Sequence, residues 1–192
     1  MNKISKNEIS AVILAGGKGS RMGGKDKGLI EFRNLPLIAY AVNVAKDRVN
    51  EIFISANRSL EDYSKYGKVI VDDLEGYQGP LAGISKALKV CSSNYLLVLP
   101  CDSPMIDSTL IAELVERMEI SDSDICVAHD GQIMHATFAL MKSNLSESLD
   151  KFLDDGGRKM ALWYRQQRTE RVNVSSHLEL LTNLNSPEDF NF

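Results

Sequence analysis

The sequence lacks long apolar runs. No segment approaches the ~20 consecutive apolar residues of a membrane span, and the first eight residues, M-N-K-I-S-K-N-E, are too polar to contain the hydrophobic region of a secretory signal. We therefore expect a cytoplasmic protein without a membrane partner.

Cysteine and histidine are also scarce, with three of each. The cysteines are odd in number and never spaced C-x-x-C, which argues against a disulfide framework and against a zinc site. The histidines are too scattered to indicate a metal site. We expect reduced, mostly buried thiols at Cys91, Cys101 and Cys126.

Positive charge is in slight deficit, with 22 Lys and Arg against 26 Asp and Glu and a net charge of −4. Because nucleic-acid binders favour basic chains, we expect no nucleic-acid partner, and local positive charge must hold any anionic ligand. No repeat, low-complexity tract or linker divides the 192 residues. We expect one domain over residues 1–192, with residues 1–8 as a loose N-terminal extension.

Glycine and cationic residues are concentrated directly after the first apolar run. Ile9–Leu14 is typical of a buried strand, and the residues that follow it, up to Leu29, are dense in glycine, lysine and arginine. Glycines let backbone N–H groups approach a polyphosphate, while the cations surround it with positive charge. The stretch predicts a phosphate-binding loop; the alternative is a surface loop without a ligand.

Two familiar glycine loops do not match this stretch. A Walker A loop fits from Gly19 to Lys25, but Asp26 replaces the hydroxyl that would hold Mg²⁺. The dinucleotide fingerprint G-x-G-x-x-G begins well at Gly17, but its last position is Met22. The loop therefore belongs to another class of nucleotide site.

Strand-like and helix-like segments alternate along the chain, which predicts a Rossmann-like, three-layer α/β/α domain with a mostly parallel sheet. Asp130-Gly131 is a hairpin turn signal, so we expect an antiparallel portion there. The expected strands are Ile9–Leu14, Glu51–Ser55, Lys68–Val71, Tyr95–Leu99, Ile125–His129, Gln132–Met141 and Val172–Val174. The expected helices begin at Pro36 and Pro80, and cover Ser108–Met118, Leu145–Leu153, Lys159–Gln167 and a turn at Pro187–Phe190.

Polar side chains follow several of these strands. In open α/β sheets the ligand crevice lies outside the carboxyl ends of the strands, so Ser55, Asn57 and Asp72 should face the ligand of the loop. Asp102 follows the most apolar strand and has a proline on either side, which restricts its backbone. We expect Asp102 to be the functional carboxylate; the alternative is that it caps the helix that starts near Asp107.

The run from Leu14 to Lys27, L-A-G-G-K-G-S-R-M-G-G-K-D-K, resembles the signature of the molybdenum cofactor guanylyltransferase (MobA) family. The likeness extends over nearly the whole chain in ordered motifs, namely residues 14–27, 55–58, 79–83, 100–102, 135–137 and 183–189. The resemblance implies a nucleotidyltransferase domain that transfers GMP from GTP to the terminal phosphate of molybdopterin. The products would be the guanine dinucleotide cofactor and pyrophosphate, with Mg²⁺ required.

The resemblance also implies roles for individual residues. Catalysis would involve Arg21, Lys27 and Asp102, with Asp102 as the Mg²⁺ ligand. GTP would be bound by Leu14, Ala15, Gly16, Gly17, Lys27, Ser55, Asp72 and Asp102. The acceptor side would hold His135, Asn183 and Asn185.

Nucleotide choice and partners follow from the same likeness. Related cytidylyltransferases resemble L-A-A-G where this chain has Gly16-Gly17, which favours guanine. The chain departs from the family at Ser55, Ala136 and Ser186, where Asn, Pro and Thr are usual. Expected partners are GTP, molybdopterin or Mo-molybdopterin, molybdenum-insertion proteins and molybdoenzyme chaperones, and we expect a monomer or weak oligomer.

Two other functions stay open from the sequence. One is a related nucleotidyltransferase that makes a cytidine or sugar dinucleotide. The other is a non-catalytic GTP-binding regulator, against which Asp102 and Lys27 argue, because a pure binder has less need of a rigidly placed metal carboxylate.

Overall fold

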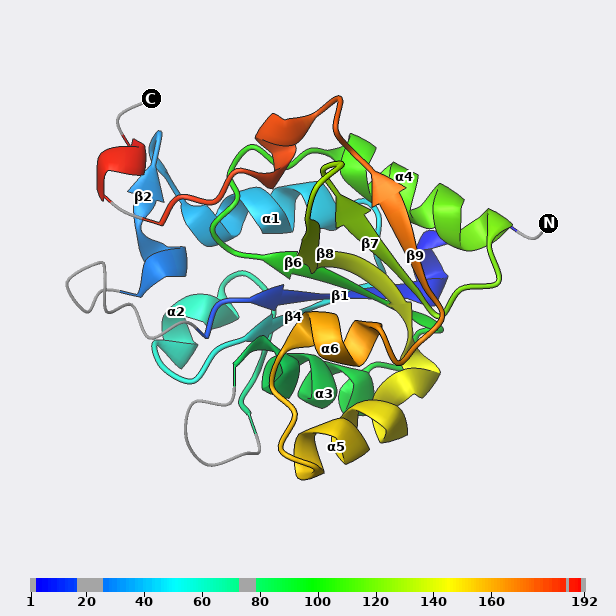
Figure 1. The fold of residues 1–192 in the computed structure, drawn as a ribbon. Helices are drawn as coiled ribbons and strands as arrows, with labels where there is room; N and C mark the ends of the chain where they lie inside the picture. The colour runs from blue at the N-terminus through cyan, green and yellow to red at the C-terminus, as the bar shows by residue number, and fades with distance from the viewer. Residues whose placement is uncertain (1–2, 17–25, 73–78, 186, 191–192) are drawn as a thin grey trace.

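The computed structural model describes residues 3–16, 26–72, 79–185 and 187–190, and shows a three-layer α/β/α arrangement (Figure 1). The strands are β1 Ile9–Leu14, β2 Glu31–Phe32, β3 Leu35–Pro36, β4 Glu51–Ser55, β5 Lys68–Ile70, β6 Tyr95–Pro100, β7 Ile125–His129, β8 Met134–Lys142 and β9 Thr169–Asn173. The α-helices are α1 Leu37–Ala45, α2 Leu60–Ser64, α3 Pro80–Val90, α4 Ser108–Ile120, α5 Ser146–Asp154 and α6 Met160–Tyr164. Short 3₁₀ turns cover Lys6–Glu8, Lys27–Leu29, Ser143–Leu145, Leu178–Leu181 and Pro187–Phe190.

Seven strands form the central sheet in the order β5-β4-β1-β6-β8-β7-β9. Within it, β8 runs antiparallel to both of its neighbours, whereas the other pairs are parallel. The chain moves outward from β1 through β4 to β5 and then crosses back to β6, on the other side of β1. This reversal is the topological switch point at which open α/β sheets bind ligands.

Both faces of the sheet are buried, because successive side chains of a strand point to opposite faces. Leu97 packs with Leu114 and Phe138 in a cluster between the sheet and helices α1 and α4. Leu96 packs with Trp163 in a cluster between the sheet and helices α3, α5 and α6. The continuous apolar run of β6 therefore reflects a strand covered by helices on both sides.

Strand β8 opens the sheet at the site end. It pairs with β6 only as far as Ala139, which lies opposite Val98, whereas β6 continues to Pro100. The pairing of β7 with β8 also shifts register just before the hairpin turn, as at a β-bulge. The chain around Thr137 thus leaves β6 and makes room beside Pro100.

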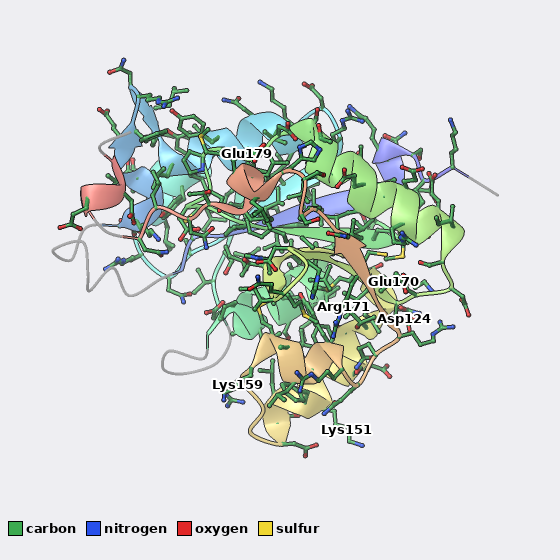
Figure 2. All side chains as sticks on the ribbon, turned by 45° about the horizontal axis from the view of Figure 1, so that its top comes forward. Asp124, Lys151, Lys159, Glu170, Arg171 and Glu179 are labelled. Carbon is green, nitrogen blue, oxygen red and sulfur yellow. The ribbon has the colours of Figure 1, made fainter. Side chains whose placement is uncertain are left out.

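Ion pairs hold the start of the distant β7 and β9 strands. Arg168 pairs with Asp122 and Asp124, and Lys142 also pairs with Asp124, which is labelled in Figure 2. The hydrogen bonds from Arg168 lower the pKa of Asp124 to about 2. This network lies at the amino-terminal ends of β7 and β9, away from the carboxyl ends of the parallel strands.

The expected fold class is confirmed: an α/β domain with a mostly parallel sheet and an antiparallel β7–β8 hairpin. The β2–β3 hairpin and helix α2 were not predicted, and of the 3₁₀ turns only Pro187–Phe190 was. The hairpin turns at Arg33 and Asn34, both of which have positive φ. The usual sequence signal for such a turn is Asn or Asp followed by glycine, and here the Asn has no glycine beside it, so the turn was not recognised. Strand β9 begins at Thr169, three residues before the expected start at Val172. Only Val172 of this edge strand is buried, so its first residues show no apolar pattern that could have revealed them.

The described part of the N-terminal segment is attached to the domain, in contrast to the loose extension that we expected. The backbone N–H of Ile4 donates a 2.7 Å hydrogen bond to Glu119, and its side chain packs against the core. Ser5 and Glu8 form a capping box on the first 3₁₀ turn. Among the described residues, no helix is long and apolar enough to cross a membrane.

Candidate functional site

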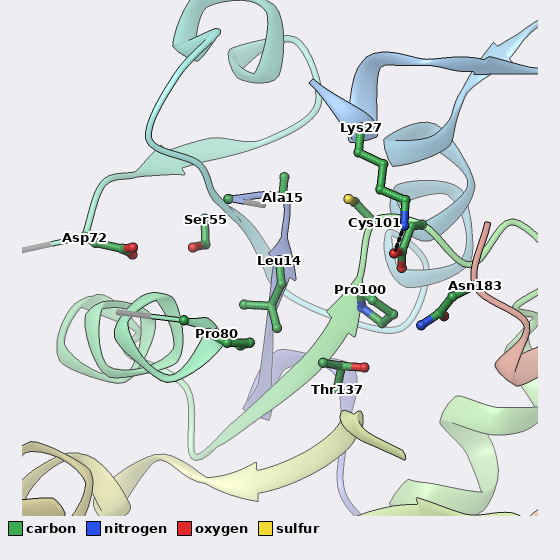
Figure 3. Close-up of a pocket in the computed structure, with 13 residues that line it drawn as sticks. Leu14, Ala15, Lys27, Ser55, Asp72, Pro80, Pro100, Cys101, Thr137 and Asn183 are labelled. Atoms are coloured by element: carbon green, nitrogen blue, oxygen red, sulfur yellow. Dashed lines mark hydrogen bonds and ion pairs between the residues drawn. The ribbon is translucent and has the colours of Figure 1, made fainter. Parts of the chain in front are cut away.

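A pocket of about 220 Å³ opens at the carboxyl ends of β1, β4 and β6 (Figure 3). Its lining residues are Leu14, Ala15, Gly16, Lys27, Ser55, Asp72, Gly79, Pro80, Pro100, Cys101, Asp102, Thr137 and Asn183. They come from segments that are far apart in the sequence. The pocket therefore depends on the sheet order.

Backbone hydrogen bonds continue between the chain segments that directly follow the strands around the pocket. The Ala15 N–H donates to the Ser55 carbonyl at 2.9 Å, and the Cys101 N–H donates to the Leu14 carbonyl at 3.2 Å. On the outer side, the Ala56 N–H donates to the Ile70 carbonyl at 3.1 Å. The residues after β1, β4, β5 and β6 consequently start from fixed positions around a single space.

Lys27 and Asp102 form the charged centre of the pocket. The Lys27 ammonium is bonded to the Asp102 carboxylate, as the dashed line in Figure 3 marks, and also donates to the Asn185 side-chain oxygen at 2.7 Å. The Lys27 and Asp102 side chains are only 17% and 16% exposed. The second Asp102 oxygen, Oδ1, is buried and has no hydrogen-bond partner among the described residues, so it can accept a further ligand.

The segment from Asn183 to Asn185 lies across the loop that carries Asp102. The Leu184 N–H donates to the Asp102 carbonyl at 2.9 Å, and the Ser103 hydroxyl donates to the Asn183 side chain. The Leu184 side chain is buried in a small cluster at the start of α1. Asn183 and Asn185 are therefore part of the same wall as Asp102.

Asp72 lies on the opposite side of the pocket and is oriented by Asn57. The Asn57 amide donates to Asp72 Oδ2 at 2.8 Å, and the Asp72 N–H donates back to the Asn57 side-chain oxygen at 3.1 Å. Asp72 Oδ1 is buried and has no hydrogen-bond partner among the described residues. This oxygen is an acceptor held ready for a donor on a ligand.

The first turn of α3 lies beside Ser55. A Cβ on Gly83 would lie 2.1 Å from the Ser55 hydroxyl oxygen, so only glycine allows this contact. The helix begins with Pro80 after Gly79, which has a positive φ. Ser55 is 5% exposed and thus lies at the floor of the pocket, against the helix start.

Cys101 lines the pocket as a neutral thiol. Burial raises the pKa of Cys101 well above its usual range, and the neighbouring Asp102 carboxylate acts in the same direction. The side chain is 6% exposed. It contributes an apolar surface to the pocket, as expected of a reduced, buried cysteine.

His135 is not among the residues that line the pocket. Its Nε2 lies 2.7 Å from Asp130, whose other oxygen accepts from the N–H groups of Gln132 and Ile133. The hydrogen bond to His135 holds the pKa of Asp130 well below its usual range. His135 is two residues before the pocket residue Thr137 on β8, and its role at the acceptor side stays a prediction.

The sequence-predicted site residues mostly converge. Asp102 does not cap α4, since Asp107 performs that role by accepting from the Thr109 N–H. Gly17 and Arg21 lie outside the described residues. The pocket also contains Thr137, which belongs to the family motif at residues 135–137 but was not among the expected site residues, and the opening of β8 away from β6 brings it into the site. The residues that meet in the pocket as expected are Leu14, Ala15, Gly16, Lys27, Ser55, Asp72, Asp102 and Asn183, with Asn185 bonded to Lys27.

Comparisons with known proteins identify the family. The family model described as a MobA-like NTP transferase domain matches residues 11–171. Molybdenum cofactor guanylyltransferases from Shewanella pealeana and Vibrio atlanticus are 41% and 42% identical to the chain over 182 residues. These matches cover 94% and 95% of this chain and 91% and 93% of the relatives.

A solved structure has the same fold. Molybdopterin-guanine dinucleotide biosynthesis protein A from Archaeoglobus fulgidus superposes with a TM-score of 0.79 at 19% identity, covering 94% of both chains. At this identity the likeness concerns the fold alone. The family model and the relatives that match nearly the whole length of the chain show that the pocket belongs to a nucleotidyltransferase. The chain is a member of the MobA-like family of molybdenum cofactor guanylyltransferases.

Proposed function

We propose that this chain transfers GMP from GTP to the terminal phosphate of molybdopterin, releasing pyrophosphate. The observation that carries the proposal is a pair of buried carboxylate oxygens without hydrogen-bond partners among the described residues. Asp72 Oδ1 and Asp102 Oδ1 both belong to residues that line one pocket, which Lys27 also lines. One carboxylate suits the base of the nucleotide, and the other suits a cation at its phosphates.

Guanine recognition is assigned to the Asp72 side of the pocket. Guanine presents N1–H and N2–H donors, and Asp72 Oδ1 is an acceptor held in place by Asn57. Adenine and cytosine present a ring-nitrogen acceptor at the corresponding edge, which a carboxylate repels. Backbone groups of Ala15 and Gly16 line the same part of the pocket and complete the contacts to base and ribose.

Phosphate binding is assigned to Lys27. Its ammonium is a compact cation on a flexible stem, and it is paired with Asp102. Bound triphosphate competes with Asp102 for this ammonium. Lys27 then neutralises charge on the phosphates in both the ground state and the transition state.

The family implies Mg²⁺, and Asp102 fits a role as its protein ligand. Mg²⁺ is usually held by one or two carboxylates together with substrate phosphates and waters, so the absence of a cluster of three metal-ligating side chains among the described residues is no objection. The buried, unpartnered Asp102 Oδ1 is a suitable oxygen. When bound, the ion supplies charge neutralisation at the phosphates.

The transfer requires positioning more than proton chemistry. An oxygen of the acceptor phosphate forms a bond to the α-phosphorus of GTP while the bond to the bridging oxygen of pyrophosphate breaks. The acceptor phosphate is already largely dianionic near neutral pH, so no general base is needed. Asn183 and Asn185, which form one wall with Asp102, are assigned to the acceptor side.

The Asp72→Asn variant tests the guanine assignment. The Asn57 amide should keep the oxygen of the new side chain, because Asp72 accepts from it now, which leaves an NH₂ group facing the guanine donors. We expect calorimetry to show GTP affinity lowered roughly 10- to 100-fold, whereas ATP and CTP should bind more tightly, because the NH₂ group can donate to the ring nitrogen that the carboxylate repels. Exposed Asp47 provides the control variant, Asp47→Asn. Wild-type protein that binds ATP or CTP as tightly as GTP would contradict guanine recognition itself.

Gly16→Ala tests nucleotide choice without disturbing the protein. A Cβ at residue 16 would lie 3.7 Å from the Ser55 carbonyl oxygen and 3.8 Å from the Asn57 amide, which are ordinary contacts. We expect an unchanged melting temperature and about a tenfold lower ratio of GTP to CTP affinity, because the methyl group occupies space beside the base-reading Asn57–Asp72 pair. Gly83→Ala is the contrasting variant, since its Cβ would collide with Ser55, and it should lower the melting temperature. An unaltered affinity ratio in Gly16→Ala would remove Gly16 from the selection of the base.

A further inference from the structure

Asp26 is a nearly buried carboxylate directly before Lys27. Its side chain is 6% exposed. Asp26 precedes the 3₁₀ turn Lys27–Leu29, where an aspartate would ordinarily cap the turn, but its side chain makes no capping hydrogen bond. The carboxylate points elsewhere, and its partners explain why a costly buried charge is kept at this position.

Two residues of one short connection converge on Asp26. The Tyr63 hydroxyl donates to Asp26 Oδ1 at 2.7 Å, and Arg58 Nε lies 3.1 Å from Asp26 Oδ2. This second contact compensates charge without satisfying hydrogen-bond geometry, since Oδ2 has no hydrogen-bond partner among the described residues. Both partners lie between β4 and β5, where Arg58 follows Asn57, the residue that orients Asp72.

Tyr63 connects the core of the domain to this end of the phosphate loop. Its side chain is fully buried in a cluster with Ile13 and Ile54, under the ends of β1 and β4. Burial raises the pKa of Tyr63 far above its usual range, so the hydroxyl stays protonated and acts as the donor. A Cβ on Gly28 would lie 2.6 Å from the Tyr63 hydroxyl oxygen. The tyrosine therefore contacts the chain on both sides of Lys27.

We infer that Tyr63 is a positioning residue for the transfer reaction, acting through Asp26 to fix the backbone from which Lys27 reaches the phosphates. Arg58 compensates the charge of Asp26 in the same assembly. The inference rests on the proposed function, because it requires that Lys27 binds the triphosphate. It makes a buried hydroxyl group, on a residue that does not line the pocket, a determinant of phosphate affinity.

The Tyr63→Phe variant tests this inference by comparing two ligands. GTP and guanosine share the base and ribose, but only GTP reaches Lys27. Calorimetry should show GTP affinity lowered about tenfold, as for the loss of a hydrogen bond to a charged group, while guanosine affinity stays at the wild-type value. The control is Tyr164→Phe, which removes another buried tyrosine hydroxyl, one that donates to the Ala136 carbonyl at 2.9 Å. It should lower thermal stability and leave the ratio of GTP to guanosine affinity unchanged.

Asp26→Asn supplies a second, independent variant. It keeps an oxygen for the Tyr63 hydroxyl but removes the charge that Arg58 compensates, so the same ratio should fall, and turnover should slow with it. If Tyr63→Phe keeps the wild-type ratio, or if both ligands lose affinity equally, the positioning role is wrong. If wild-type protein itself binds GTP no better than guanosine, the phosphate role of Lys27 is wrong, which is a failure of the proposed function.

Discussion

Replacing Asp102 by asparagine should reduce Mg²⁺-dependent formation of the dinucleotide by roughly 10²- to 10³-fold, as for the loss of a major stabiliser of transition-state charge. Asparagine keeps the size of the side chain but lacks the negative charge that Mg²⁺ requires. The fold should survive, because the backbone contacts of residue 102 with Leu184 do not involve the side chain. Product measured by chromatography, at fixed GTP and acceptor, reports the loss.

The same variant should bind metal-free GTP as well as the wild type does, or better. Asp102 is bonded to Lys27, and loss of this ion pair should free the ammonium for the triphosphate. Asp107→Asn is a suitable control, since Asp107 caps α4 outside the pocket. Near-normal Mg²⁺-dependent turnover in Asp102→Asn would mean that another carboxylate holds the metal, and Asp72 and Asp26 would be the next to test.

Replacing Lys27 by alanine should weaken GTP binding with or without Mg²⁺ and also slow turnover. Under the proposed function, this cation neutralises phosphate in the ground state and in the transition state, so its loss should affect both KM and kcat. We expect kcat/KM to fall on the order of 100-fold, the size of effect seen when one transition-state donor is removed. Calorimetry with and without the metal separates this variant from Asp102→Asn. Lys46→Ala, at an exposed lysine that directly follows α1, is the matched control.

A double-mutant cycle on Lys27 and Asp102 adds a check on the ion pair itself. Residues in contact are expected to be non-additive, so the two variants combined should affect metal-free GTP binding differently from the sum of the single effects. Strict additivity would indicate that the two side chains act independently in solution. If Lys27→Ala alone binds GTP as tightly as the wild type does, Lys27 does not bind the phosphates, and another cation of the loop must do so.

Much of the site could be predicted because its residues directly follow strands. Ser55, Asp72 and Asp102 each follow, or end, an apolar run whose carboxyl end meets the others once the sheet is parallel. The alternation of strands and helices is visible in the sequence, and so is the most apolar strand, β6. These features depend on hydrophobic periodicity alone, which short-range patterns report well.

The remaining features depend on contacts between distant segments. Thr137 enters the pocket because β8 pairs with β6 only from Ala139 onward, which leaves the preceding residues of β8 apart from β6. No local sequence pattern indicates where two strands separate. Tyr63 lies on a five-residue helix too short to show periodicity, and in the sequence its apolar ring indicates only core packing. Its bond to Asp26 joins residues 37 positions apart, which is a property of the folded chain.

The contact between Lys27 and Asn185 joins positions 158 residues apart. During synthesis, the ribosome releases the loop that carries Lys27 long before the segment that closes over it. The seven strands of the sheet all end at or before Asn173, so they can emerge and pair before Asn185, although Val174, Leu180 and Leu181 also belong to one core layer. The wall of the pocket that holds Asn183 and Asn185 is thus completed by residues that follow the sheet, and they lie beyond the part of the chain that the family model matches.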